Sequence, residues 1–176
     1  MPLTPDLATC HSDFWTPLGT VRAFSDGEAV TALLFRDRVR RGGNPGWPSS
    51  ATPRLPLFLE LGAWLDTYFG GRDPGPPPAL RCPGTPFQMA VWDEVSAIPW
   101  GSWSSYSAIT LAVALKRGAG PSNPRAVGRA VGANQTAILV PCHRVIGKGG
   151  TLGGFGYEPE LKAALLELEG ITGVSP

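Results

Sequence analysis

The residues of this sequence best suited to chemistry stand together in Pro141–Cys142–His143–Arg144. A cysteine becomes a nucleophile as its thiolate, and neighbouring cations favour that form. Asn134 lies upstream, where its amide can brace a turn. Adjacent side chains on an extended backbone point in opposite directions, so the motif alone leaves open whether His143 takes the thiol proton directly or through a water. The alternative is a buried, unreactive cysteine.

Capped helices and one short strand are predicted to position this motif. The predicted elements are helices over 85–98, 105–117, 124–133 and 159–169 and a buried strand over 137–140. Thr85 and Asn123 are each followed by proline, a pattern typical of a helix start, and Ser105 or Ser107 can cap the helix between them. Two helices across a short turn indicate a helix-turn-helix before the cysteine.

The first half of the chain is predicted to form a smaller, separate domain. The expected divisions are a poorly ordered lead-in over 1–13, an N-terminal α/β domain over 14–70, a linker over 71–84 and a C-terminal domain over 85–172. Two strands joined by a turn at Ser25–Asp26–Gly27 are expected in the α/β domain, because Asp-Gly favours tight hairpins. Apolar residues recur at helical spacing over 55–69, which predicts a helix there.

Composition and charge describe an ordinary globular protein with one basic segment. The chain has 176 residues, of which 43% are apolar, and its formal net charge is +1. Residues 81–150 carry seven basic and two acidic side chains, so the local charge is +5 (seven minus two). A local excess of this kind can steer a phosphate backbone toward one face. A solvated basic surface is the alternative.

Other features exclude several classes of protein. No stretch approaches the roughly 20 consecutive apolar residues that a membrane span needs. The three cysteines are an odd number without a CxxC pair, and the chain has two histidines. We therefore expect no disulfide framework, no metal site, no cofactor and no membrane partner. A cytoplasmic monomer is expected, since thiols stay reduced in the cytoplasm.

Five motifs follow one another along the second half of the chain. They are GTPFQMAVW (84–92), IPWGSWSSY (98–106), PRAVGRAVGAN (124–134), ILVPCHRVIG (138–147) and LLELEG (165–170). Together they resemble the O6-alkylguanine-DNA alkyltransferase family, the methylated-DNA–protein-cysteine methyltransferases. The resemblance extends weakly toward the N-terminus. It implies an α/β plus α fold: a small N-terminal α/β domain with a β-sheet, and a mainly helical C-terminal domain with a helix-turn-helix and an active-site cysteine.

The resemblance implies direct-reversal DNA repair, in which Cys142 takes an alkyl group from O6 of guanine, or from O4 of thymine as a second candidate. No ordinary step cleaves the thioether product, so each molecule would act once, as a single-turnover transferase. His143 would be the base through a water, Glu169 would hold its useful tautomer, and Asn134 would brace the turn. The backbone around Val145 would read the guanine's amino edge.

A base inside a duplex must be extruded before its O6 can be reached. By the resemblance, Arg125 would fill the vacated place in double-stranded DNA, and Tyr106 would meet the flipped base or its 3′ phosphate. Small residues such as Ala126 and Gly128 would let the helix enter the minor groove without sequence preference. Further backbone contacts are expected at Gln88, Ser107 and Lys148. The protein would be nucleoid-associated when bound, or nuclear in a eukaryote.

Two departures from the family pattern concern the turn and the lid. The connection through 116–123 is several residues longer than usual, which enlarges the turn of the helix-turn-helix. The family's Gly-Tyr-rich lid is altered within 153–162, where Phe155 keeps the ring without the hydroxyl and Gly156 follows. We expect both Phe155 and Gly156 to border the alkyl group and to affect which bulky adducts are accepted.

Two other functions stay open from the sequence. A non-catalytic lesion sensor of the alkyltransferase-like kind would bind damaged DNA, but proteins of that kind lack the reactive cysteine that is present here as Cys142. A Cys–His hydrolase would need an oxyanion hole and would leave the helix over 124–133 unexplained.

The basic segment predicts DNA binding that weakens with salt. Each lysine or arginine that neutralises a phosphate releases counterions, so affinity falls as salt rises. Fluorescence anisotropy of a labelled duplex at increasing salt measures this dependence. An affinity indifferent to salt would contradict the prediction.

Overall fold

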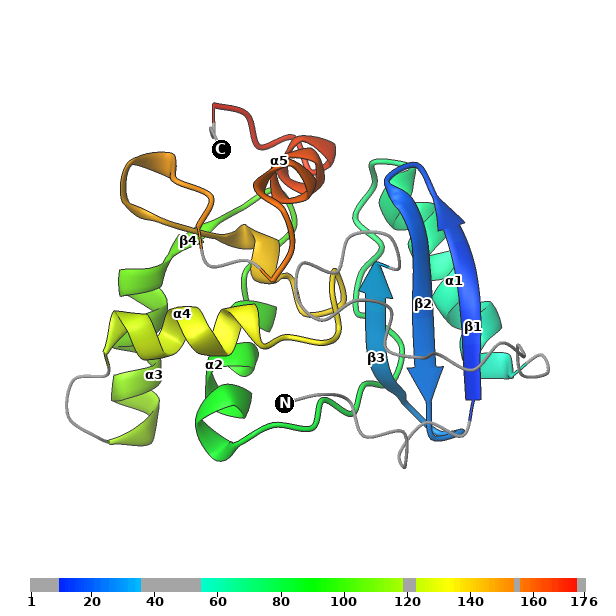
Figure 1. Ribbon diagram of the computed structural model, residues 1–176, viewed down its shortest axis with the longest axis horizontal. Coiled ribbons are helices and arrows are strands. Elements are labelled where there is room, and N and C mark those ends of the chain that lie inside the picture. Colours follow the sequence, from blue (N-terminus) through cyan, green and yellow to red (C-terminus); the bar gives the residue numbers. More distant parts are fainter. Residues whose placement is uncertain (1–9, 36–54, 119–122, 154–155, 174–176) are drawn as a thin grey trace. The chain divides into compact units, whose positions relative to one another are not determined.

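The computed structural model describes residues 10–35, 55–118, 123–153 and 156–173 (Figure 1). The chain divides into two compact units. The first comprises the residues up to Cys82 together with Gln135–Ala137, and the second comprises Pro83–Asn134 and the residues from Ile138 onward. The division between Cys82 and Pro83 falls inside the Gly- and Pro-rich segment predicted as a linker.

A three-stranded antiparallel sheet forms the centre of the first unit. Its strands are β1 (Cys10–Thr16), β2 (Gly19–Ser25) and β3 (Val30–Phe35), in the order β1-β2-β3. The predicted turn lies between β2 and β3, where Gly27 has a φ of 100° and Asp26 accepts the backbone N–H of Glu28 and Ala29. The hairpin prediction is therefore correct.

Strand β1 begins at Cys10, so the prediction of a disordered lead-in is wrong for residues 10–13, and its remaining part, residues 1–9, lies outside the described residues. Its register places Asp13 opposite Arg22 of β2, and the two side chains form a bidentate ion pair with N···O distances of 2.6 and 2.7 Å. Arg22 is buried, so this cross-strand pair neutralises its charge. The polar residues of β1 hid its pairing from a search for apolar periodicity.

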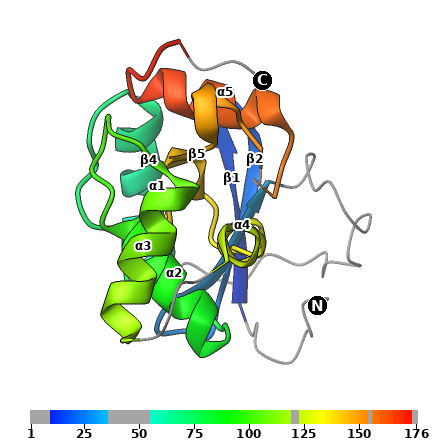
Figure 2. The same ribbon diagram turned by 90° about the vertical axis from the view of Figure 1, so that its left-hand side faces the viewer.

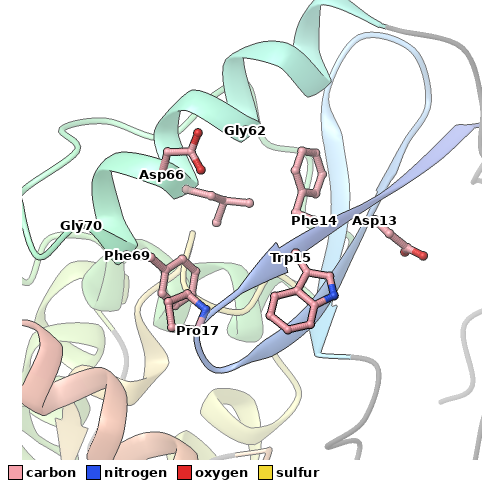
Figure 3. A pocket seen from close by; sticks show the side chains of 9 residues that line it. Asp13, Phe14, Trp15, Pro17, Gly62, Asp66, Phe69 and Gly70 are labelled. Carbon is pink, nitrogen blue, oxygen red and sulfur yellow. The ribbon is translucent and has the colours of Figure 1, made fainter.

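One helix, α1 (Pro56–Phe69), packs beside β1 (Figure 1). Its buried face consists of Phe58, Leu61, Leu65 and Tyr68, at the helical spacing that predicted it. A hollow of about 480 Å³ between α1 and β1 is bordered by apolar side chains and by the carboxylates of Asp13 and Asp66 (Figure 3). None of the predicted site residues lines this hollow.

The run 137–140 is a turn, and the prediction of a strand there is wrong. Thr136 alone forms a β-bridge with Leu33 of β3, made by hydrogen bonds between the Leu33 backbone and the residues on either side of Thr136. The backbone then turns at Ile138, whose φ is +70°, an unusual conformation for a β-branched residue. All four residues of the run are buried. Burial produced the apolar pattern without strand pairing.

Four α-helices are described in the second unit: α2 (Pro86–Ser96), α3 (Tyr106–Arg117), α4 (Pro124–Gly132) and α5 (Pro159–Leu168). The side chains of Thr85, Ser105 and Asn123 cap α2, α3 and α4, as the sequence predicted, and Ser105 rather than Ser107 is the cap of α3. Helices α2, α3 and α4 pack on one another (Figure 2). The buried Trp92 indole donates to the Ala130 carbonyl at 2.9 Å, which joins α2 to α4.

Short elements connect α4 to α5. They are the 3-10 turns η3 (Cys142–Arg144) and η4 (Lys148–Gly150), and the two-residue strand β5 (Val145–Ile146), which pairs in parallel with β4 (Ser104–Ser105). The pairing brings the residues after the cysteine beside the start of α3. In the parts of the chain described here, no helix is long and apolar enough to cross a membrane.

Candidate active site and DNA-binding helix

Cys142 begins the 3-10 turn η3 and is almost completely buried, with 1% of its surface exposed. Its backbone N–H donates to the Val140 carbonyl at 2.8 Å. The same carbonyl accepts the side-chain amide of Asn134 at 2.9 Å. Asn134 therefore braces the turn that presents the cysteine, through a carbonyl six residues further along the chain.

His143 is fully buried and contacts Glu169. Its Nε2 lies 2.7 Å from Glu169 Oε1. Burial lowers the pKa of His143 and outweighs the opposing effect of Glu169, so the ring is neutral at physiological pH. Cys142 and His143 lie on a tight 3-10 turn. The sequence left open how their side chains are directed, because an extended backbone was the other possibility.

Glu169 caps the end of α5 and is ionised. Burial alone raises its pKa, but hydrogen bonds and charges from His143 and Arg144 outweigh burial and lower the pKa to about 2. An ionised carboxylate only accepts hydrogen bonds, so Nε2 of His143 is the donor. The neutral ring then carries its lone pair on Nδ1. Glu169 therefore selects the tautomer.

Arg144 completes this arrangement, with a role that sequence reasoning did not assign. Its Nε and Nη2 donate to the two carboxylate oxygens of Glu169 at 2.7 and 3.1 Å, and Nη1 donates to the Ile98 carbonyl at 2.6 Å. The sequence predicts Arg144 only as a cation beside Cys142. In the structure the Arg144 side chain is directed toward Glu169, a contact that no feature of the sequence indicates.

Tyr106 and Val145 lie on a second side of the site. The Tyr106 hydroxyl donates to the Gly153 carbonyl at 2.5 Å, and the same carbonyl accepts Nζ of Lys162 at 3.2 Å. Lys162 also donates to the Val145 carbonyl at 2.6 Å. Burial, with the nearby Cys142, raises the pKa of Tyr106, so its hydroxyl keeps its proton. Sequence reasoning missed Lys162, although a lysine within the apolar face of α5 was a visible signal.

Helix α4 presents the predicted DNA-binding residues. Arg125 is exposed in its first turn, while Ala126 and Gly128 are half-buried. A Cβ added to Gly128 would lie 3.9 Å from the Tyr106 ring, so the small helix and the tyrosine are neighbours. Ser107 at the start of α3 and Lys148 of η4 are exposed.

Gln88 and Gly156, two further predicted site residues, make different kinds of contact in the structure. The Gln88 side chain accepts the Thr85 backbone N–H and so forms a capping box of α2. Gly156 lies where an added Cβ would be 3.0 Å from the Gly132 carbonyl, so a larger residue there would press on the end of α4. Phe155 lies outside the described residues.

Within the described ranges, no group of three or more His, Cys, Asp or Glu side chains is arranged to hold a metal ion. The three cysteines, all of them described, are not joined in disulfides.

The fold and site define a class: a protein with a buried cysteine, an adjacent histidine–carboxylate pair and the packed helices α3 and α4 in one unit. Residues 86–171 match the family profile described as 6-O-methylguanine DNA methyltransferase, DNA binding domain. The methylated-DNA–protein-cysteine methyltransferase of Haemophilus influenzae is 36% identical over 93% of this chain and 88% of its own length. The protein of that name from Mycobacterium leprae is 37% identical over 88% of each chain.

Solved structures agree with these relatives. The crystal structure of Mycobacterium tuberculosis OGT in complex with DNA is 35% identical, covers 92% of both chains and superposes with a TM-score of 0.75. The crystal structure of O6-methylguanine methyltransferase from the same organism is 36% identical, covers 91% of this chain and 92% of its own, and has a TM-score of 0.73. The chain belongs to the methylated-DNA–protein-cysteine methyltransferase family.

Replacing Glu169 by glutamine should destabilise the protein strongly at neutral pH. The change leaves Arg144, which is 11% exposed, without its counter-charge, and breaking a buried pair typically costs about 3 kcal/mol. The folded-state pKa lies below the ordinary 4.5, so the stability from ionised Glu169 is complete above that pH and lost as pH falls toward about 2. Urea denaturation across this range should show the deficit shrinking.

Glu167→Gln is the matched control, because Glu167 is exposed in the same turn of α5. It should change the free energy of unfolding by less than about 0.5 kcal/mol. A Glu169→Gln deficit that is the same at acid and neutral pH would contradict the assigned ion pair.

Proposed function

We propose that this protein repairs alkylated DNA directly, by moving the alkyl group from O6-alkylguanine in a duplex to Cys142 in a single irreversible turnover. The observation that carries the proposal is the buried Cys142 beside a histidine whose tautomer is set by an ionised glutamate. The relatives named methylated-DNA–protein-cysteine methyltransferase support the reaction class.

The proposed chemistry begins with the thiol proton. The Nδ1 lone pair of His143 accepts it through a water, and Glu169 stabilises the resulting imidazolium. The thiolate of Cys142 attacks the alkyl carbon, a carbon–sulfur bond forms, and the carbon–oxygen bond breaks with its electron pair remaining on O6 of guanine. A proton returned to the base yields neutral guanine. The thioether stays on Cys142, so the protein is consumed.

The hydroxyl of Tyr106 would assist the leaving base. Its raised pKa keeps the hydroxyl protonated, and when the base binds, the hydroxyl would exchange the Gly153 carbonyl for the negative charge that develops on guanine. The backbone of Val145 would bind the amino edge of the base. Gly156 and Phe155 would border the alkyl group, which makes their segment the determinant of adduct size, and O4-alkylthymine is a further candidate substrate.

Burial of Cys142 requires a flipped base. A thiol with 1% of its surface exposed cannot reach an atom inside a stacked duplex, so the nucleotide must leave the stack. We propose that α4 enters the minor groove, where Ala126 and Gly128 permit close approach and Arg125 fills the gap. Ser107, Lys148 and Gln88 would contact the backbone. The solved complex of a relative with DNA supports this partner.

The expected setting is a monomer acting on DNA in the cytoplasm, where a nucleophilic thiol stays reduced. A lesion sensor without transfer would have no use for the cysteine and its histidine–glutamate pair. For that reason the transferase is the function that the site supports best, and one measurement separates the two.

Incubation with a duplex that carries one O6-methylguanine should add one methylene mass to Cys142. Intact-protein mass spectrometry followed by peptide mapping measures the gain, which should stop after one equivalent. Cys142→Ser should abolish the gain and spare DNA binding, whereas Cys82→Ser, at a half-buried thiol of the other unit, should change neither. Lesion-specific binding with unchanged mass would favour the sensor instead.

Replacing Arg125 by alanine should slow repair of duplex DNA far more than reaction with free O6-methylguanine base. The arginine is needed only where a base must be extruded, so single-turnover rates on the two substrates should diverge by tenfold or more, which corresponds to a loss of about 1.4 kcal/mol. Arg72→Ala, an exposed arginine of the first unit, is the control and should alter neither rate. Equal losses on both substrates would disprove the role of Arg125.

A further inference from the structure

Arg129 is an exposed arginine of α4 for which the proposed chemistry has no role. It follows Arg125 by four residues, so the two side chains are neighbours on the helix surface. Like charges at this spacing destabilise a helix, and α4 contains no acidic residue that would offset them. Among the described residues, the Arg129 side chain forms no ion pair and no hydrogen bond. A second arginine at this place therefore requires an explanation.

The face of α4 that carries Arg129 consists of arginine and glycine. The apolar side chains of the helix are buried on one side. The opposite face presents two arginines and two glycines, which are Arg125, Gly128, Arg129 and Gly132. Because glycine has no side chain, the backbone on both sides of Arg129 can approach a ligand closely. A Cβ added to Gly128 would lie 3.9 Å from the Tyr106 ring, so this face borders the site.

A guanidinium distinguishes between base pairs at the floor of the minor groove. The arginine side chain has five N–H donors and no acceptor. In the minor groove an A·T pair presents only acceptors, whereas a G·C pair adds the amino donor of guanine. A guanidinium at the groove floor therefore binds beside A·T pairs and meets a competing donor beside G·C pairs. Ala126 and Gly128 carry no group that makes this distinction.

The place of Arg125 on the DNA determines where Arg129 lies. Four residues of helix advance by about 6 Å along its axis, which corresponds to roughly two base-pair steps of about 3.4 Å. With Arg125 in the gap left by the flipped base, Arg129 lies within about two base pairs of the lesion. Gly128 and Gly132, on the same face, keep this part of α4 close to the groove floor.

We propose that Arg129 is a specificity-determining residue, which makes this protein bind and repair lesions better where A·T pairs flank them. The groups that it recognises are the acceptors at the floor of the minor groove, N3 of adenine and O2 of thymine. The inference rests on the proposed function for the entry of α4 into the minor groove. It adds a preference for flanking sequence that the small residues of the helix do not provide.

Duplexes that differ only beside the lesion test the proposal. Each carries one O6-methylguanine, flanked on both sides by A·T pairs, by G·C pairs, or by I·C pairs, in which inosine lacks the amino group of guanine. Fluorescence anisotropy gives the dissociation constants with the Cys142→Ser protein, so that no alkyl group is transferred during binding. The A·T duplex should bind about tenfold more tightly than the G·C duplex, and the I·C duplex should bind like the A·T duplex.

Three substitutions of Arg129 separate its donors from its charge. Arg129→Ala removes both, Arg129→Lys keeps a charged group that only donates, and Arg129→Gln has an acceptor beside its donors. Flanking pairs also change the stability of the duplex itself, so the preference is judged by its change on substitution. The Ala and Gln variants should lose most of it, and the Lys variant should keep it. Arg72→Ala, at an exposed arginine of the first unit, is the control and should match the parent.

Two results would overturn the inference. If Arg129→Ala weakens binding to all three duplexes equally, the arginine contacts phosphates or stabilises the end of α4, and it reads no base pair. If the I·C duplex binds the parent like the G·C duplex, the guanine amino group is not what Arg129 detects. Circular dichroism checks folding, and because Arg129 is exposed, its substitution should leave the fold intact.

The binding measurement involves no alkyl transfer, so the two proposals fail separately. A preference for A·T flanks that depends on Arg129, in a protein whose Cys142 gains no methyl group, would refute the transfer and leave this inference standing. Methyl transfer to Cys142 with a flanking preference that is the same in the parent and in Arg129→Ala would do the reverse.

Discussion

The buried carboxylate of Glu169 is the interaction on which the second unit's site depends. It accepts hydrogen bonds from His143 and Arg144, and the backbone N–H of Gly101 lies 3.4 Å from it. Through Arg144 it is also tied to the Ile98 carbonyl. One anion thus fixes the tautomer of the histidine, holds η3 to the end of α5 and connects both to the turn after α2. An ionised group this deeply buried is tolerable only because its partners are complete.

The helices of the second unit could be predicted because their signals are local. Thr85 and Asn123, each before a proline, define helix starts without reference to the rest of the chain. Strand β1 could not be predicted, because Asp13 becomes suitable for a strand only when Arg22 lies opposite it. The prediction of a strand over 137–140 failed for a related reason, because a turn buried by tertiary contacts shows the same apolar run as a central strand.

The site was predictable to the extent that its residues are adjacent in sequence. Cys142 and its neighbours stood out as a motif, whereas Glu169 follows His143 by 26 residues and entered only through the family resemblance. No spacing rule connects residues so far apart on different elements. The role of Arg144 depends on which way a 3-10 turn directs its side chain, and that of Lys162 on two carbonyls from other segments. Both are properties of the folded chain.

Helix α5 carries the two buried charges in the less favourable order. A helix favours anions near its N-terminus and cations near its C-terminus, yet Lys162 stands near the start of α5 and Glu169 caps its end. The helix dipole alone would favour the two charges in exchanged positions, so it cannot explain where they stand. Their positions are explained by the segments that they hold, since Lys162 donates to the Val145 and Gly153 carbonyls and Glu169 binds His143 and Arg144. In a protein whose cysteine reacts once, the stability lost to these two buried charges maintains a thiol that is ready to react and is not regenerated.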